Sequence, residues 1–431
     1  MAMQGRSRLA LAVMASVANA VRTEAASTST ENPYVLPFEE CYKWASQVFN
    51  DSYNDYLNHA PRFTGGSDPL RLNKYNDWNE IERYITSRQS RYRSVVRVDR
   101  GQETTRFGRK LYVVKIGSPS VKFSTCRYPK PIVLVKAGSR GLEWITSAMA
   151  LYTIEKLITN YDKVEAIQKV DWWIVPMANP DGYALSYENK DDFDGRTKMK
   201  NVANSTLAFY NGVNLDYNYP VSFAKGGFPE KEKDKPNSYF YPGEAPFSEP
   251  ESRFVRDLLT GHPLSRFVRA YAHIHRGCGF EVVSDGKIIH PFYYSNTSEP
   301  AFLKEKLIPT AGRMKDALNL ATSPHLPQPI WSTHFPHYLY EILPGYHVGN
   351  QGGDHLDWAS RDAGIPYAFT LRVPEEEDFA FPEKVYDACA FLRYAKCYGH
   401  KAERIEPFSE QLFRGLLALA QDVNRDYCDG Y

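Results

Sequence analysis

The chain has 431 residues, of which 43% are hydrophobic, 24% are charged and 14% are aromatic. This length and composition exclude a disordered tail or a small disulfide-stapled module, and they fit one large α/β domain with extensions. Its 52 basic and 51 acidic side chains give a net charge of +1, which argues against nucleic acid as a partner, and no apolar run is long enough to span a membrane.

The N-terminus has the pattern of a secretory signal peptide over residues 1–20. Arg6 and Arg8 precede an apolar run at residues 9–17, and an Ala-x-Ala cleavage site follows at residues 18–20. A mitochondrial transit peptide is the alternative, because the segment contains arginines and lacks acidic residues. We expect a secreted, extracellular protein. Three glycosylation sequons agree with this expectation: Asn50, Asn204 and Asn296.

Three segments follow the signal peptide. Residues 21–73 are polar and lack a hydrophobic period, which predicts an N-terminal extension without a full prodomain. Residues 74–400 form the main domain, and residues 401–431 are expected to be a C-terminal extension with a docking helix. The six cysteines allow up to three disulfides, and the sequence does not choose among the 15 pairings.

The main domain alternates strands and helices along the chain. A helix is expected from Asp77, and apolar residues at steps of three and four predict another from Trp144 to Ile158. The segment Ser248 to Glu251 has the pattern of a capping box, which predicts a helix that continues to Gly261. We expect strands at residues 111–116, 132–136, 171–175, 268–275 and 366–373, and a last helix at residues 383–398. This alternation predicts an α/β fold with a mixed, largely parallel central sheet and helices on both faces.

Eight short motifs follow one another along the main domain. They are Gly108–Leu111, Gly138–Trp144, Asn179–Tyr183, Gly212–Tyr219, Tyr241–Gly243 with Pro246–Glu251, Ile274–His275, Asp357–Trp358 and Gly364–Thr370. In this order and spacing, the motifs resemble those of the zinc carboxypeptidases of the A and B type. The resemblance runs from about Asp77 to Tyr398 and implies the fold of that family.

The resemblance also implies a zinc-dependent exopeptidase. The family holds Zn²⁺ with a His-x-x-Glu pair and a distant His, and a separate Glu takes a proton from the zinc-bound water. Glu143 matches the ligand carboxylate and His275 matches the distant His, but the first His of the pair is replaced by Arg140. A guanidinium has no lone pair to offer a metal. We therefore expect Arg140 to lie where zinc would be, paired with Glu143, so that zinc binding is doubtful here.

The family's catalytic Glu is also replaced. Ungapped alignment puts Arg372 at that position, and a slip of two residues would put Thr370 there. Neither residue can act as a general base. The acidic run at residues 375–378 lies beyond the strand, and its default interpretation is a solvated loop.

Four positions correspond to the family's substrate contacts. The Asn-Arg pair that binds the terminal carboxylate of a peptide is represented by Asp216 and Tyr217, an anion and a phenol. Arg196 approaches the position of the family's other clamp arginine, and Leu356 corresponds to the base of the specificity pocket. A substrate carboxylate would meet Asp216 as a like charge, and any surviving pocket would be apolar.

A rearranged metal site is one alternative. His273 and His275 lie two apart on a strand and face the same way, so that with Glu143 they could hold one ion. Alternatively, His273 is only a hydrogen-bonded neighbour in a cavity filled by Arg140. We expect a secreted pseudopeptidase that has lost zinc-dependent hydrolysis and binds a peptide or protein. The other hypotheses are an active peptidase that uses the rearranged site to cleave C-terminal apolar residues, and a purely structural partner-binding protein.

Overall fold

The computed structural model describes the greater part of the main domain. The described residues are 71–118, 129–188, 212–225, 240–276, 286–292, 303–319, 339–348, 352–374 and 402–429. All of them belong to one compact unit, made of residues 56–377 and 397–431. The predicted signal peptide, the N-terminal extension up to residue 70, and the helix expected at residues 383–398 lie outside the described residues.

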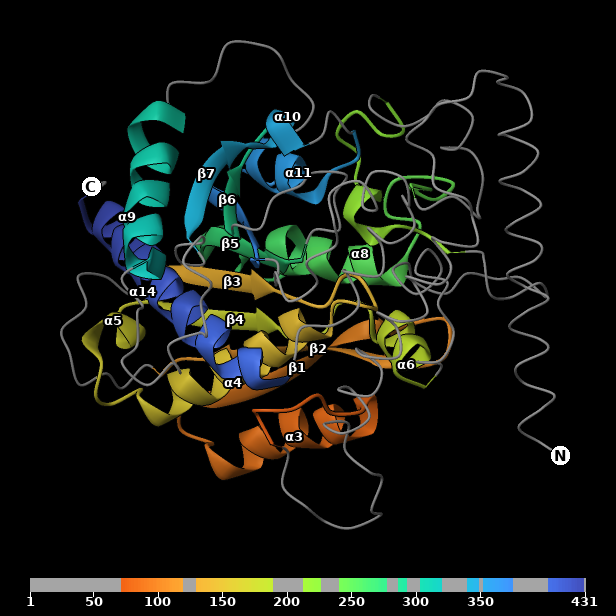
Figure 1. Ribbon diagram of the computed structural model, residues 1–431, viewed down its shortest axis with the longest axis horizontal. Coiled ribbons are helices and arrows are strands. Elements are labelled where there is room, and N and C mark those ends of the chain that lie inside the picture. The colour runs from red at the N-terminus through yellow and green to blue at the C-terminus, as the bar shows by residue number, and fades with distance from the viewer. Residues whose placement is uncertain are drawn as a thin grey trace, which may run out of the picture. The chain divides into compact units, whose positions relative to one another are not determined.

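Within the described part of the chain, a mixed sheet of eight strands forms the centre of this unit (Figure 1). The strands are β1 (Val96–Thr104), β2 (Lys110–Ile116), β3 (Ile132–Lys136), β4 (Asp171–Val175), β5 (Val268–His275), β6 (Gly286–His290), β7 (Tyr340–Pro344) and β8 (Tyr367–Arg372). Their order across the sheet is β1-β2-β4-β3-β5-β8-β6-β7. Strands β4, β3, β5 and β8 are parallel neighbours, and β6 pairs with β7 in parallel. The predicted mixed, largely parallel sheet is confirmed.

The central strands are apolar because both faces of the sheet are covered. Every residue of β3 and β8 is buried, and all of β4 is buried except its first residue. Strands that are covered on both faces need such continuous apolar runs, whereas a strand with one wet face would alternate. The sequence of β3, Ile-Val-Leu-Val-Lys, is of this kind and ends in a buried lysine.

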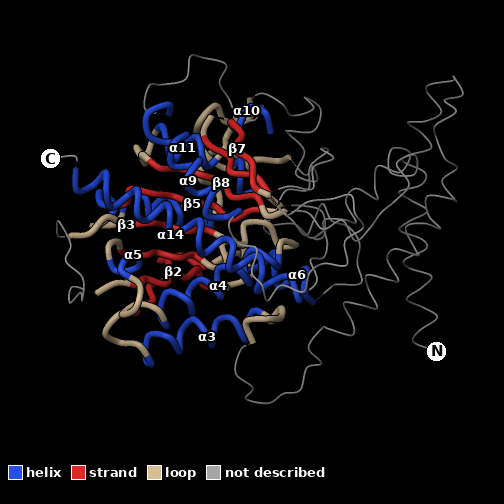
Figure 2. The backbone as a smooth tube through the Cα atoms, turned by 60° about the vertical axis from the view of Figure 1, so that its left-hand side comes forward, coloured by secondary structure: helices blue, strands red, loops and turns tan. Residues whose placement is uncertain are grey.

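Helices cover both faces of the sheet, as the sequence predicts (Figure 2). One apolar cluster joins one face to α3 (Trp78–Arg91), α4 (Trp144–Thr159), α5 (Glu165–Gln168), α6 (Pro180–Glu188), α9 (Ile308–Asn319) and α14 (Ile405–Asp429). A second cluster joins the other face to α8 (Pro250–Arg256), the π-helical turn η2 (Asp257–Gly261) and α11 (His355–Arg361). The short elements are α10 (Gly345–Val348), η1 (Leu215–Tyr217), η3 (Ser265–Phe267), η4 (Leu303–Leu307) and η6 (Ala402–Arg404).

Helix α14 lies in the segment that the sequence assigns to a C-terminal extension. It packs against α4 and α9, and its residues Leu416 and Leu419 are buried in the same apolar cluster as one face of the sheet. Asp422 on its buried side accepts hydrogen bonds from Thr310 Oγ1 at 2.8 Å and Arg313 Nε at 2.6 Å. The helix is therefore part of the sheet's hydrophobic covering.

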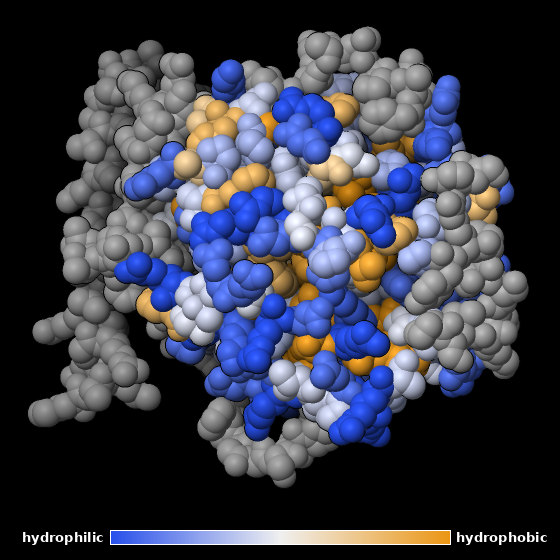
Figure 3. Space-filling model, turned by 180° about the vertical axis from the view of Figure 1, so that it is seen from behind, coloured by the Kyte–Doolittle hydropathy of each residue, from blue (hydrophilic) through white to orange (hydrophobic). Residues whose placement is uncertain are grey.

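The described surface on the side seen in Figure 3 is mostly hydrophilic, with apolar side chains visible between the polar ones. Four large apolar side chains are exposed among the described residues: Phe107, Leu264, Leu339 and Tyr346. None of the helices in the described ranges is long and apolar enough to cross a membrane.

Candidate functional site

The candidate site lies where the parallel strands end. Strands β3, β5 and β8 run in the same direction, and the sheet register sets Lys136 beside His273 and His275 beside Arg372. Ligands of open α/β sheets bind at this carboxyl edge, where loops leave the strands. The loop between β3 and α4 supplies Arg140 and Glu143, two of the charged residues at this edge.

A tight turn after β3 carries Arg140 and Glu143 into the buried edge. Gly138 has a φ of +66°, and a Cβ at this position would lie 2.5 Å from Ser147 Oγ, so that only glycine fits without strain. The turn ends at Glu143, which directly precedes α4. Arg140 and Glu143 are only 6% and 2% exposed. Both side chains therefore need partners within the protein.

Glu143 is held by β5 and the residue that follows it. Both oxygens of its carboxylate lie 3.1 Å from Nδ1 of His275, and its Oε2 accepts a hydrogen bond from the backbone N of Arg276, also at 3.1 Å. Arg140 Nη1 lies 3.8 Å from Glu143 Oε1. The two residues that match the family's metal ligands thus contact each other directly.

The zinc that the resemblance implies does not fit these residues. Arg140 offers no electron pair to a metal, and its guanidinium is close to the Glu143 carboxylate. A single positive charge about 4 Å from a divalent ion costs about 8 kcal/mol at an effective dielectric constant of about 20. Zinc at Glu143 and His275 would therefore require Arg140 to move out of a buried position.

Arg140 pairs more closely with Asp216 than with Glu143. Its Nε donates to Asp216 Oδ2 at 2.9 Å, and Lys136 Nζ lies 3.8 Å from the other carboxylate oxygen. Asp216 sits in η1, where the side chain of Asn214 accepts from its backbone N at 3.2 Å. The expected partner of Arg140 was Glu143, and the structure adds a nearer one from the position of the family's carboxylate clamp.

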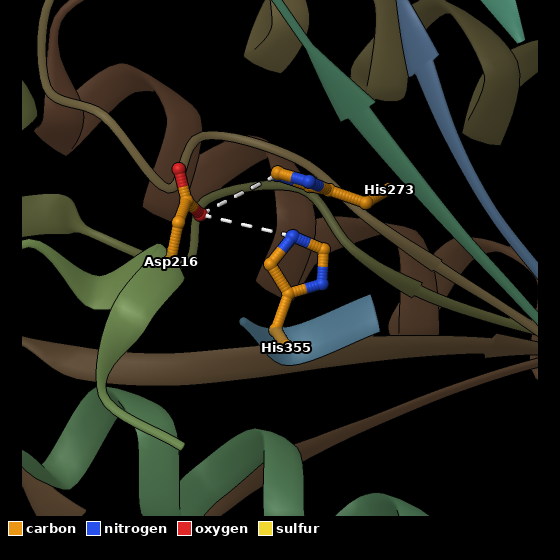
Figure 4. Close-up of side chains that lie close together, drawn as sticks. All are labelled: Asp216, His273 and His355. Atoms are coloured by element: carbon orange, nitrogen blue, oxygen red, sulfur yellow. Dashed lines mark ion pairs between the residues drawn. The ribbon is translucent and has the colours of Figure 1, made fainter. Parts of the chain in front are cut away.

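Two histidines face the Oδ1 atom of Asp216 (Figure 4). His273 Nε2 and His355 Nε2 each lie 4.0 Å from Asp216 Oδ1. These three side chains are buried, and one ligand atom from each lies within 4.8 Å of the others. They are the one group of three or more metal-ligating residues with this geometry among the described residues. The alternative group of Glu143, His273 and His275 is not among the groups with this geometry.

Each histidine has a further contact that orients its ring. Tyr271 OH lies 3.1 Å from His355 Nδ1, and Ser139 Oγ lies 3.2 Å from His273 Nε2. The two rings meet edge to face, with centroids 4.3 Å apart. His273 and His275 stack on the same side of β5 with centroids 5.5 Å apart, in agreement with their spacing in the sequence.

Sequence reasoning did not identify His355. The sequence feature that could have indicated it is the pair Gly352-Gly353 shortly before it, because both glycines allow another backbone segment to approach closely. A Cβ on Gly353 would lie 2.2 Å from the carbonyl oxygen of Tyr217, and Gly353 O accepts from Tyr219 N at 3.0 Å. This contact brings the start of α11 next to η1, and therefore His355 next to Asp216.

Burial and charge set the protonation of this cluster. Burial lowers the pKa of Lys136 to about 8, although Asp216 opposes the shift. Burial, and then the charge of Lys136, lowers the pKa values of His273 and His355 well below their usual range. Burial raises the pKa of Asp216, but Arg140 and Lys136 outweigh it and hold this pKa below its ordinary value. At neutral pH the cluster therefore combines an ionised carboxylate with neutral imidazoles.

The remaining predicted positions are distributed around this edge. Arg372 is 4% exposed at the end of β8, and Thr370 lies opposite His273 in the sheet. Tyr217 is 7% exposed in η1, and Leu356 is fully buried in the apolar cluster under α11. Arg196 and the acidic run at residues 375–378 lie outside the described residues. No carboxylate takes the place of the family's catalytic Glu at either aligned position of β8, since these hold Thr370 and Arg372.

Comparison with known proteins gives a consistent result. A family model described as zinc carboxypeptidase matches residues 81–392. Mouse Carboxypeptidase A4 is 27% identical over 279 residues, which are 63% of this chain and 56% of that protein. A Sclerotinia sclerotiorum protein named Inactive metallocarboxypeptidase ecm14 is 24% identical over 285 residues, 64% of this chain and 44% of that protein. The match thus spans about half the length of these two relatives.

The fold is also that of solved structures. The carboxypeptidase A of Helicoverpa armigera superimposes with a TM-score of 0.67 at 22% sequence identity, and the match covers 88% of this chain and 81% of that one. A structure of thrombin-activatable fibrinolysis inhibitor gives a TM-score of 0.66 at 20% identity, over 87% of this chain and 81% of that one. At these identities the likeness shows the fold alone.

Proposed function

Because the chain belongs to the zinc carboxypeptidase family, we propose that it is a member that has lost zinc-dependent hydrolysis and acts by binding a peptide or protein partner. The observation that carries this proposal is the buried ion pair between Arg140 and Asp216, with Nε 2.9 Å from Oδ2. Arg140 stands at a metal-ligand position of the family, and Asp216 stands at a position of its carboxylate clamp. One ion pair therefore joins the residue that replaces a metal ligand to the residue that replaces a carboxylate-binding side chain.

The other replacements support the same proposal. Glu143 is bound to His275 and to the backbone N of Arg276, and Arg372 stands at the position of the general base. Catalytic groups that act as a unit are strongly non-additive, so that loss of one already costs several orders of magnitude in rate. Two fungal relatives carry the name Inactive metallocarboxypeptidase. Loss of hydrolysis is compatible with membership in this family.

The proposed binding role concerns the edge of the sheet at β3, β5 and β8. A peptide with a free terminal carboxylate would meet Asp216, which is negative but already paired with Arg140 and close to Lys136. We therefore expect no family-type capture of the terminal carboxylate by this residue. From the signal-like residues 1–20, we further propose that the protein acts outside the cell.

A peptidase assay tests the loss of hydrolysis. We expect no release of C-terminal residues from peptides ending in apolar, basic or acidic residues, because neither the family's metal site nor its base is complete. The assay is done with the full chain at neutral pH with added Zn²⁺, and an active zinc carboxypeptidase serves as the positive control. Release of C-terminal residues that stops on addition of a chelator would contradict the proposal.

The same assay on a variant with one restored metal ligand tests whether the other replacements also prevent hydrolysis. Arg140→His restores the family's first metal ligand but leaves Arg372 at the position of the base and Asp216 in the clamp. We therefore expect that this variant also remains inactive. Recovery of chelator-sensitive turnover by Arg140→His alone would show that the other replacements are tolerated, and it would contradict our account of them.

A further inference from the structure

His273 and His355 have no part in the proposed function, and with Asp216 they form a buried cluster of possible metal ligands. Its donor atoms are one carboxylate oxygen and two imidazole nitrogens, a set that suits Zn²⁺ and related transition metal ions. We propose that these three residues bind a divalent ion of this type, at a position displaced from the family's zinc site.

The distances allow one ion to contact all three side chains. Two ligand atoms that are each about 2.0–2.2 Å from an ion can lie at most about 4.4 Å apart. Asp216 Oδ1 is 4.0 Å from both His273 Nε2 and His355 Nε2. In Figure 4 both rings approach the same carboxylate from β5 and α11. The ligand atoms of His273 and His355 lie within 4.8 Å of each other, so that side-chain movements of a few tenths of an ångström are enough to close the site.

Unsatisfied atoms point to a missing ligand. Asp216 Oδ1 has no hydrogen-bond partner among the described residues, although the side chain is only 5% exposed. Buried polar atoms are otherwise almost always paired, and an unpaired buried oxygen costs free energy. A metal ion bonded to Oδ1 would satisfy this atom, which Lys136 Nζ at 3.8 Å is too distant to reach with a hydrogen bond.

The surroundings hold one imidazole in the orientation that a metal needs. If His355 Nδ1–H donates to the oxygen of Tyr271, at 3.1 Å, then Nε2 keeps its lone pair on the side of Asp216. Metal-bound histidines commonly have such a second hydrogen bond, which fixes their tautomer. The N-terminus of α11 is held in place as well, because Asp354 accepts from the backbone N of Leu356 at 2.7 Å.

The proposed site shares no residue with the family's ligand set. Glu143 and His275, which match that set, are bound to each other, while the new set takes Asp216 from η1 and His355 from α11. The inference does not depend on hydrolysis, so that its failure would leave the proposed function standing.

Two cations set the expected strength of binding. Lys136 Nζ is 3.8 Å from the same oxygen that would contact the ion, and Arg140 is bonded to the other oxygen of this carboxylate. Both repel a divalent ion by energies of the same order as the one given above for Arg140 beside the family's zinc position, so that we expect far weaker binding than at a dedicated zinc site. For the same reason, Lys136→Met should tighten binding by about tenfold or more.

Metal titration of the full chain tests the proposal. The protein is prepared without a tag, treated with a chelator, and titrated with Zn²⁺ by calorimetry and with Co²⁺ by visible absorption. We expect one equivalent to bind, and His355→Gln to weaken binding by about tenfold or more. Asp216→Asn should do the same, but it also breaks the pair with Arg140. His355→Gln, which leaves that pair intact, is therefore the deciding variant.

Two control variants separate this site from others. Glu143→Gln changes the residue at the family's ligand position, and His347→Gln changes an exposed histidine on α10. His347→Gln should leave the affinity unchanged and Glu143→Gln should weaken it far less than His355→Gln does, and circular dichroism checks that each variant is folded. The proposal is overturned if the wild-type chain binds no ion, if His355→Gln or Lys136→Met leaves the affinity unchanged, or if Glu143→Gln abolishes binding.

Discussion

Asp216→Ala is expected to lower the free energy of unfolding by about 3–5 kcal/mol, the usual effect of removing one partner of a buried ion pair. The reason is that Arg140 and Lys136 remain buried when their shared carboxylate is lost. Arg140 Nε is 2.9 Å from this carboxylate, and Lys136 is 1% exposed. Urea-induced unfolding, followed by circular dichroism near pH 7.5, measures the change.

An exposed ion pair provides the matched control for Asp216. Asp257 pairs with Arg256 at 2.8 Å, but the two side chains are 55% and 37% exposed. Exposed pairs contribute about 0–1 kcal/mol, so that Asp257→Ala should have only a small effect. If Asp216→Ala were as mild as Asp257→Ala, the ion pair would not be the buried structural feature that we infer.

The second large effect is a loss of stability in mild acid. In metal-free protein, His273 and His355 have pKa values well below the ordinary value of 6.5, because burial and then Lys136 disfavour their charged forms. As the pH falls below 6.5, the unfolded chain binds protons that the folded chain does not. For each such proton, the free energy of unfolding falls by about 1.4 kcal/mol for every pH unit below 6.5. The two histidines together lower it by about 2.7 kcal/mol per pH unit. The stability is therefore present above pH 6.5 and is lost below it.

Other titratable groups near these rings also change how the free energy of unfolding depends on pH. The test therefore compares variants. The pKa of His275 is also lowered, which adds to the loss, whereas burial and Asp357 raise the pKa of Asp354, which opposes it. Urea unfolding between pH 7.5 and pH 5 should show a slope that is smaller by about 1.4 kcal/mol per pH unit in His355→Phe. The exposed control His347→Phe should keep the wild-type slope. Equal slopes in all three proteins would show that His355 is protonated in the folded state.

Five of the eight described strands (β2, β3, β4, β5 and β8) could be predicted from the sequence because their signals are local, whereas β1, β6 and β7 were not predicted. Buried strands such as β3 and β4 are short apolar runs, and β5 alternates in period two. The capping box at Ser248 was predicted wrongly. Ser248 Oγ is bound by Asn218 Nδ2 at 2.8 Å, and the N-cap residue of α8 is Glu249, without a side-chain cap. The tertiary contact outweighs the local pattern there.

The candidate site could be predicted only in part. Arg140, Glu143 and His275 are found because each lies in a short motif whose spacing fixes its place. His355 could not be found in this way, since its approach to Asp216 depends on the packing of Gly353 against η1, more than a hundred residues earlier. Contacts between distant loops are set by the folded backbone and have no period in the sequence.

A crystal structure determined from zinc-soaked crystals, with anomalous scattering measured at the zinc edge, tests the central claim most directly. We predict that the guanidinium of Arg140 remains paired with Asp216 and that no anomalous peak lies within bonding distance of Glu143 and His275. A peak at Asp216, His273 and His355 would agree with this prediction. A zinc ion ligated by Glu143 and His275, with Arg140 swung away from Asp216, would contradict it.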